Sequence, residues 1–229
     1  MEKCMIIDVR GALGNQVLEL LVGLARLKSR NQIPSLIKIN VGGNVVDTVK
    51  VNWLETIFNL PCESRVVNGS AKQRAWSVSN FLTITDSSLI NSLDFKSQPT
   101  KNNLTLLHVR GKDRQTASLE DYLTLMNRAG KDVKLIGDDQ VLINRIIENA
   151  GYGENISGTP QEDWLKCIGA KEIYTSFSSF TVSATLFDPS KKIHFLTSES
   201  SHGPAKVHPK EYKCIDALVK SYFTNSEWI

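Results

Sequence analysis

The second half of the chain alternates short apolar runs with amphipathic segments, and this pattern constrains the fold more than any other feature of the sequence. Apolar runs of this kind predict buried strands, and apolar residues at a helical spacing predict the helices between them. Strands that alternate with helices form parallel sheets covered on both faces. Strands are expected at 104–109, 133–136, 172–175 and 193–196, and helices at 119–128, 141–147, 164–168, 180–187 and 211–223.

The N-terminal part of the chain opens with the same kind of unit. The apolar run 4–9 predicts a strand, and the turn Arg10-Gly11-Ala12-Leu13-Gly14-Asn15 leads into a helix whose apolar spacing starts at Val17. Asn15 is expected to be the N-cap of that helix. A strand, a tight turn and a helix in this order open a Rossmann-like layer.

The segment between these two regions has a weaker pattern. Strands are expected at 36–39, 65–67 and 81–85, and a short helix at 53–58. The pattern does not indicate how these elements are arranged in the fold. The polar segment 96–103 contains a proline and lacks periodicity, so it is the expected linker. The sequence therefore predicts an α/β protein of two Rossmann-like lobes with parallel sheets, at 1–100 and 101–229.

Composition limits the function only broadly. Hydrophobic residues make up 41% and charged residues 22% of the 229 residues, as in globular domains, and the net charge of +3 is too small to indicate nucleic acid. The four cysteines are scattered without zinc-binding spacing, which favours buried thiols in a reducing compartment. The first apolar run is too short for a secretory signal, and no stretch approaches the roughly 18 apolar residues of a transmembrane helix. We therefore expect a cytoplasmic protein without a transmembrane segment.

The strand at 104–109 ends in the most informative group of side chains. Ligands of doubly wound sheets bind beyond the carboxyl ends of the strands, and Arg110 follows this strand directly. Alternation places His108 and Arg110 on the same face. A guanidinium at this edge suits a diphosphate, and Lys112 and Arg114 add positive charge. An ion pair within the protein is the alternative role for Arg110.

Two more strand ends carry polar residues. Asp138 and Asp139 precede a helix; one is expected to cap it, and the other either does the same or accepts hydrogen bonds from a ribose or a base. The serine-rich turn 175–181 precedes another helix and would either bind phosphate or simply cap that helix. The glycine-containing turn after the first strand either admits a ligand to the backbone or is an ordinary tight turn. Arg110, the aspartate pair and the serine turn share one sheet edge, which predicts a diphosphate-nucleotide site.

An ordered set of motifs resembles the bacterial alpha-1,2-fucosyltransferases, glycosyltransferase family 11. Residues 11–16, G-A-L-G-N-Q, resemble the family's G-G-L-G-N-Q opening, and His108-Val-Arg110 resembles the start of its H-x-R-R-G-D motif. Asp163-Trp-Leu-Lys-Cys167 and the turn 176–181 resemble its late D-x-x-x-(M/C) and S-S-F-S motifs. Gly111 and Lys112 stand where the family has Arg and Gly, and Thr181-Val182 replaces a frequent Trp pair.

The resemblance implies a GT-B-like fold and an inverting, metal-independent transfer of L-fucose from GDP-fucose to a glycan hydroxyl, without a cofactor. It implies an acceptor-side N-terminal lobe and a C-terminal lobe that binds the nucleotide sugar. Arg110 would stabilise the leaving diphosphate, and Asp113 is the first candidate for the base, before Glu120 and Asp121. The expected donor contacts are His108, Arg110, Lys112, Asp138, Asp139, Ser178, Ser179 and Phe180, and the expected cleft residues of the first lobe are Gly11, Gly14, Asn15 and Gln16.

Several alternatives stay open at this point. The donor could be a different nucleotide sugar, or the chain could be a non-catalytic nucleotide- or glycan-binding domain. A response-regulator-like or phosphatase-like domain built on Asp138 and Asp139 is a third class, but acidic residues at the other strand ends are too few for its metal. The expected acceptor is an oligosaccharide or a glycolipid. Lys210, Lys213 and Lys220 in the last helix permit peripheral membrane contact, although a solvated helix face explains them equally.

Overall fold

The protein forms two compact units, each built around its own parallel sheet. The computed structural model describes residues 4–10, 12–31, 36–42, 52–60, 62–66, 82–85, 87–111, 117–176, 178–196 and 209–229. The units are Met1–Gln98 and Pro99–Ile229, and the division falls within the polar segment 96–103. Among the described helices, none combines the length and the apolar character that a membrane crossing needs.

The N-terminal unit contains a small parallel sheet and one long helix. In the described part of this unit, three strands pair in the order β1-β2-β3, and α1 connects the first to the second and packs on β1. The buried side of α1 is mostly apolar, with Gln16 and Glu19 as its buried polar residues, and this apolar side is why the helix forms the centre of the unit. The elements are β1 (Cys4–Arg10), α1 (Leu13–Lys28), β2 (Leu36–Gly42), α2 (Leu54–Ile57), β3 (Cys62–Val66), η1 (Thr83–Thr85) and α4 (Ser87–Ile90).

Two sequence predictions in this unit are wrong. Helix α1 begins at Leu13 with Ala12 as its N-cap, so Asn15 lies inside the first turn and caps nothing. Leu13 is buried as the first residue of the helix. The helix therefore begins two residues before Asn15, the polar residue that was expected to cap it. The strand expected at 81–85 is absent, since Thr83–Thr85 forms a 3₁₀ helix. The residues of this segment are β-branched, as residues of strands often are, but so short a run does not distinguish a strand from a 3₁₀ helix.

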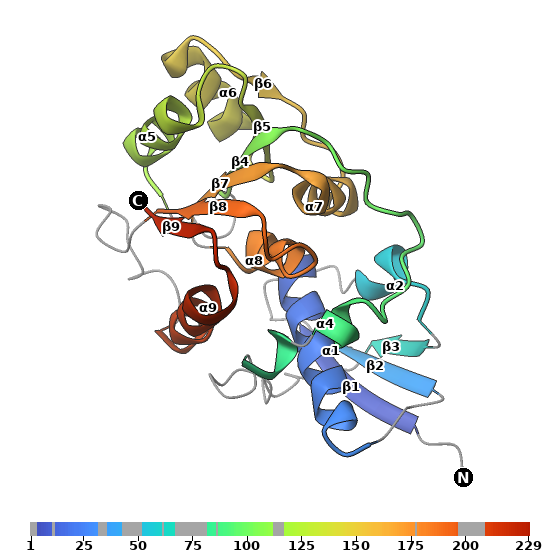
Figure 1. Ribbon diagram of the computed structural model, residues 1–229. Coiled ribbons are helices and arrows are strands. Elements are labelled where there is room, and N and C mark those ends of the chain that lie inside the picture. The colour runs from blue at the N-terminus through green and yellow to red at the C-terminus, as the bar shows by residue number, and fades with distance from the viewer. Residues whose placement is uncertain are drawn as a thin grey trace. The chain divides into compact units, whose positions relative to one another are not determined.

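The C-terminal unit is a doubly wound α/β layer (Figure 1). Within the described residues its six strands are all parallel and lie in the order β6-β5-β4-β7-β8-β9. Numbered along the chain within this unit, the order is 3-2-1-4-5-6, in which the direction of winding reverses between β4 and β7. The strands are β4 (Thr105–Val109), β5 (Lys134–Gly137), β6 (Glu154–Asn155), β7 (Glu172–Thr175), β8 (Lys192–Phe195) and β9 (Ser226–Trp228).

Helices cover both faces of this sheet. Helices α5 and α6 pack on the face that contains Leu107, Leu135 and Tyr174. On the other face α7 packs against β5 and α8, and its buried Trp164 donates from Nε1 to Ser183 Oγ at 2.9 Å. The helices are α5 (Leu119–Ala129), α6 (Gln140–Ala150), α7 (Pro160–Gly169), α8 (Ser179–Thr185) and α9 (Pro209–Tyr222).

Polar residues determine where α5 and α7 begin. Ser118 and Asp121 form a capping box at the start of α5, with Ser118 N–H donating to Asp121 Oδ2 at 2.7 Å. Thr159 and Glu162 form the equivalent box in front of α7.

At the C-terminus of α7 the buried Lys191 ammonium donates to the carbonyl of Ile168 at 2.7 Å and to that of Ala170. The ammonium therefore satisfies carbonyls that the end of the helix leaves unpaired.

Candidate functional site

The carboxyl ends of β4 and β7 flank the point at which the winding of the sheet reverses. Arg110 follows β4, Ser176 follows β7, and Asp138 follows the neighbouring strand β5. Doubly wound sheets bind their ligands beyond the strand ends at this reversal. The sheet topology therefore places the polar strand ends recognised in the sequence at the expected ligand position.

Arg110 is held both by its backbone and by its side chain. Its N–H donates to the Tyr122 hydroxyl at 2.9 Å, and its carbonyl accepts from the same hydroxyl at 3.1 Å. Its Nη1 lies 3.4 Å from Ser178 Oγ, to which it donates. The guanidinium, which is half-buried, is thus directed across the sheet edge from the end of β4 toward the start of α8.

Ser178 is the N-cap of α8, so the simpler of its two expected roles is confirmed. Its buried hydroxyl accepts from the Phe180 N–H at 3.2 Å as well as from Arg110. Ser179 and Phe180 form the partly exposed first turn of a helix of seven residues. We therefore assign the positive potential of this edge to Arg110 rather than to the short helix.

His108 lies in β4 as an uncharged side chain. Its ring stacks on Phe180 with the centroids 5.1 Å apart, and its Nδ1 lies 3.4 Å from Thr175 Oγ1 on the paired strand. Burial lowers the pKa of His108 to about 3, and the positive charge of Arg110 acts in the same direction. At neutral pH His108 therefore supports the start of α8 by stacking and hydrogen bonding, without adding charge.

The low pKa of His108 makes the protein less stable in mild acid. Between about pH 3 and its ordinary pKa near 6.5, the unfolded chain binds a proton that the folded chain does not, so stability falls as pH falls. From pH 7 to pH 5 this costs about 2 kcal/mol. The variant His108→Gln stays neutral, and urea unfolding at both pH values should show a loss smaller by that amount. An equal loss in both proteins would contradict a neutral, buried His108.

The aspartate pair is engaged with the backbone. Asp139 caps α6, where its Oδ1 accepts from the Leu142 N–H at 3.0 Å, and Asp138 Oδ1 accepts from the Gly111 N–H at 3.1 Å. The capping alternative is thus confirmed for Asp139. A Cβ on Gly111 would lie 2.6 Å from the Cβ of Asp139, so the start of α6 leaves no room for a side chain there. The glycine that departs from the family motif is required by this contact.

The other residues of the expected site lie in the N-terminal unit or outside the described residues. Gly11, Lys112 and Asp113 are outside them, and their roles stay predictions. Gly14, Asn15 and Gln16 form the first turn of α1 in the N-terminal unit, and Gln16 Oε1 accepts from the Trp53 N–H at 3.0 Å.

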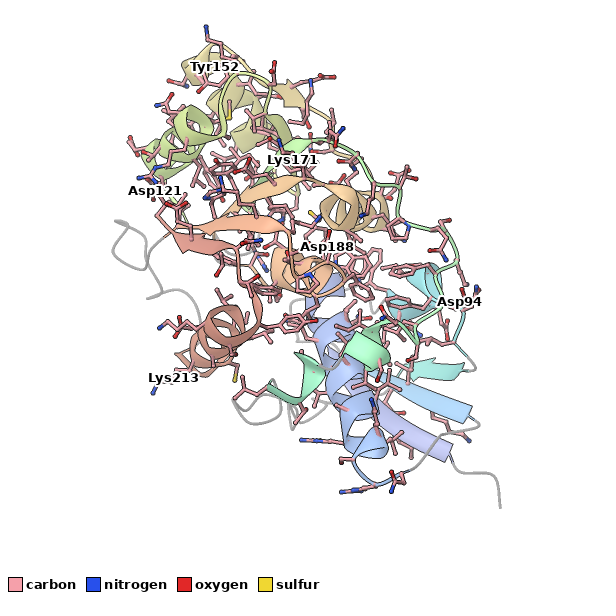
Figure 2. The ribbon with its side chains drawn as sticks, viewed as in Figure 1. Asp94, Asp121, Tyr152, Lys171, Asp188 and Lys213 are labelled. Atoms are coloured by element: carbon pink, nitrogen blue, oxygen red, sulfur yellow. The ribbon has the colours of Figure 1, made fainter. Side chains whose placement is uncertain are left out.

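Two acidic residues of the expected motifs have structural partners. Asp163 is buried, and its Oδ1 accepts from the Gly158 N–H at 2.8 Å and from Lys166 Nζ at 2.9 Å. Asp121, a reserve candidate for the base, is labelled in Figure 2 and forms part of the capping box of α5. Glu120 is exposed. Within the described residues, no three His, Cys, Asp or Glu side chains are placed to hold a metal ion.

Tyr122 belongs to this edge, although the sequence did not single it out. Tyr122 appears in the sequence as one apolar position of an amphipathic helix, and its ring is indeed buried in the core. Its hydroxyl reaches the edge and lies 3.2 Å from Ser176 Oγ. The only sequence signal was a tyrosine in the first turn of a helix that follows a site strand.

Comparison with known proteins supports the fold. Neither the protein-family models nor the curated proteins contain a match to this chain. Among solved structures it is similar to heptosyltransferase WaaC of E. coli with ADP-2-deoxy-2-fluoro heptose, at 11% identity, covering 99% of this chain and 92% of that one with a TM-score of 0.53. The same enzyme with ADP matches at 10% identity, covering 96% and 99%, with a TM-score of 0.50. The expected fold class, α/β and GT-B-like, is confirmed.

Proposed function

We propose that this protein is a glycosyltransferase that binds a nucleotide-sugar donor at the carboxyl ends of β4 and β7. The observation that carries the proposal is Arg110, held by Tyr122 and Ser178 at the reversal point of a doubly wound sheet. A guanidinium fork forms paired, charge-assisted hydrogen bonds with phosphate oxygens. The fold shared with a heptosyltransferase whose structures were solved with ADP and with ADP-2-deoxy-2-fluoro heptose supports the same assignment.

In the proposed reaction an acceptor hydroxyl attacks C1 of the donor sugar from the side opposite the diphosphate. The bond from C1 to the diphosphate oxygen breaks and its electron pair leaves with the diphosphate, which inverts the anomeric centre. Arg110 would stabilise the negative charge that grows on the diphosphate, which is the task a metal ion performs in other transferases. Asp113 is proposed to take the hydroxyl proton, with Glu120 in reserve.

Two donors have specific support. The motifs at His108–Arg110 and 176–181, which resemble those of the alpha-1,2-fucosyltransferases, favour GDP-fucose. The similar solved structure is a heptosyltransferase with an ADP-heptose analogue, and this favours ADP-heptose or a related sugar. We place GDP-fucose first, because the motifs are properties of this chain's own residues. The proposed acceptor is an oligosaccharide or a glycolipid, and the unit Met1–Gln98 is proposed to bind it. If the acceptor is a glycolipid, the protein would reach it by peripheral contact with a membrane.

The test is isothermal calorimetry of the wild-type protein with GDP, ADP, UDP and CMP, each with and without EDTA. Selective binding of GDP is expected, with the same affinity in EDTA, because Arg110 rather than a metal would hold the diphosphate. A preference for ADP would retain the transferase and move the donor toward ADP-heptose. Binding of none of the four would contradict the proposal and favour the non-catalytic alternative. Turnover would then be measured with the matching nucleotide sugar and a glycan panel.

A further inference from the structure

Arg110 stands just beyond the ladders that pair β4 with its two neighbours. The pairing with β5 ends at Val109 and Gly137, and the pairing with β7 ends at His108 and Thr175. The backbone N–H and C=O groups of a residue beyond the last pair of a ladder would normally form hydrogen bonds with water. Here one phenol hydroxyl, that of Tyr122, bonds both the N–H and the carbonyl of Arg110, at 2.9 and 3.1 Å.

The same hydroxyl also joins the two strands that flank the reversal point. Tyr122 Oη lies 3.2 Å from Ser176 Oγ, at the end of β7. Either hydroxyl can be the donor in this third hydrogen bond. All three of these hydrogen bonds of the Tyr122 hydroxyl lie at the edge where Arg110 stands.

The phenol itself is anchored rather than mobile. Tyr122 is fully buried and packs in the core with Leu125 and Met126 of the same helix. The helix that carries it begins at the capping box of Ser118 and Asp121, one turn before the ring. The position of the hydroxyl is therefore determined by the core and by the start of α5, and not by a loop.

We propose that Tyr122 is a positioning residue, which fixes the Arg110 backbone so that the guanidinium is preorganised for the donor diphosphate. The inference rests on the proposed function, since it assigns Tyr122 to the same site. A hydroxyl that holds a peptide in one orientation lowers the cost of ordering the attached side chain when the ligand binds. Its loss should therefore affect the phosphate part of the ligand and leave the nucleoside part unchanged.

The test compares Tyr122→Phe with Tyr174→Phe. Tyr174 is a matched control, because it belongs to the same core cluster and its hydroxyl donates to the carbonyl of Arg128, near the end of α5, at 3.3 Å. Affinities for GDP and for guanosine are measured by calorimetry and by ligand-observed NMR, or for ADP and adenosine if the wild type prefers ADP. We expect Tyr122→Phe to bind the diphosphate about tenfold more weakly and the nucleoside equally well, a change that corresponds to one or two net hydrogen bonds.

The outcomes separate positioning from a general loosening of the fold. Equal affinities for the diphosphate in Tyr122→Phe and Tyr174→Phe would overturn the inference, and so would a parallel loss of nucleoside and diphosphate binding in Tyr122→Phe. Arg110→Ala, measured beside them, distinguishes a failure of this inference from a failure of the proposed function. If it loses the diphosphate while Tyr122→Phe does not, the inference alone fails. If it retains wild-type affinity, the proposed function fails, and the inference with it.

Discussion

Replacement of Arg110 by alanine is expected to weaken diphosphate binding by a factor of about 100 to 20,000. The guanidinium would form two charge-assisted hydrogen bonds, each worth about 1.5–3 kcal/mol, and the variant would lose both. Folding should be affected much less, because the side-chain bond from Arg110 to Ser178 is long, at 3.4 Å, and the backbone bonds to Tyr122 remain. Calorimetry with the diphosphate that the wild type selects measures the first effect, and urea unfolding the second.

Two further variants make this result specific. Arg110→Lys retains the charge but not the planar fork, so its affinity should fall between those of the wild type and the alanine variant. Arg128→Ala removes an arginine near the end of α5, where Nη1 lies 3.9 Å from Glu227 in an exposed pair, and should leave binding unchanged. A loss in Arg128→Ala as large as in Arg110→Ala would mean that general positive charge, and not a site at this edge, binds the nucleotide.

The strands of the C-terminal unit could be predicted from the sequence because each is a separate apolar run. The expected strand 172–175 coincides with β7, and 104–109 starts one residue before β4. The expected strands 133–136 and 193–196 are each shifted by one residue relative to β5 and β8. Periodicity carries no information on which strands pair, so the 3-2-1-4-5-6 order required the structure. Arg110 and Ser178 could nevertheless be placed together from the sequence, because the carboxyl ends of neighbouring parallel strands lie at one edge of the sheet.

The two edge strands, β6 and β9, could not be predicted, because backbone hydrogen bonds to the neighbouring strand determine their structure and no side-chain pattern marks them. β6 consists of Glu154–Asn155, and it is continued by the Ile156 N–H, which donates to the Leu135 carbonyl at 2.9 Å. β9 is Ser226–Trp228, after which the Ile229 N–H donates to the Phe195 carbonyl at 2.7 Å. Short polar segments of this kind have no periodicity of their own, and the neighbouring strand supplies the template on which they form.

Parts of the site were beyond sequence analysis for a different reason. Tyr122 has the spacing of a core residue, and only the three-dimensional position of its hydroxyl relates it to Arg110. The role of Gly111 likewise depends on α6, whose first residues lie about 30 positions further along the chain. In the sequence Gly111 is a departure from the family motif, whereas in the structure it is the residue that allows Asp139 to cap the helix.

The variant Gly111→Ala is expected to destabilise the fold by about 3 kcal/mol. The new Cβ would lie 2.6 Å from the Asp139 Cβ, closer than two carbon atoms can pack, so either the strand end or the helix start must move. Overpacking of this kind costs roughly 1–3 kcal/mol, and displacing the cap of α6 adds about 1 kcal/mol. The arginine that the family motif has here carries the same Cβ, so it should be no better tolerated. Urea unfolding measures the change.

A double-mutant cycle identifies the contact responsible. Asp139→Gly removes the Cβ that would be struck, and glycine caps a helix only a few tenths of a kcal/mol less well, so this single change should be mild. In the double variant with Gly111→Ala most of the loss should disappear, which corresponds to a coupling of about 2 kcal/mol between two positions far apart in sequence. Asp138→Gly is the matched control, because it removes the neighbouring carboxylate but leaves the Asp139 Cβ in place, and it should not rescue Gly111→Ala. Additive costs in the Asp139 cycle would show that Gly111 is needed for another reason, and that the start of α6 does not determine which residue can follow Arg110.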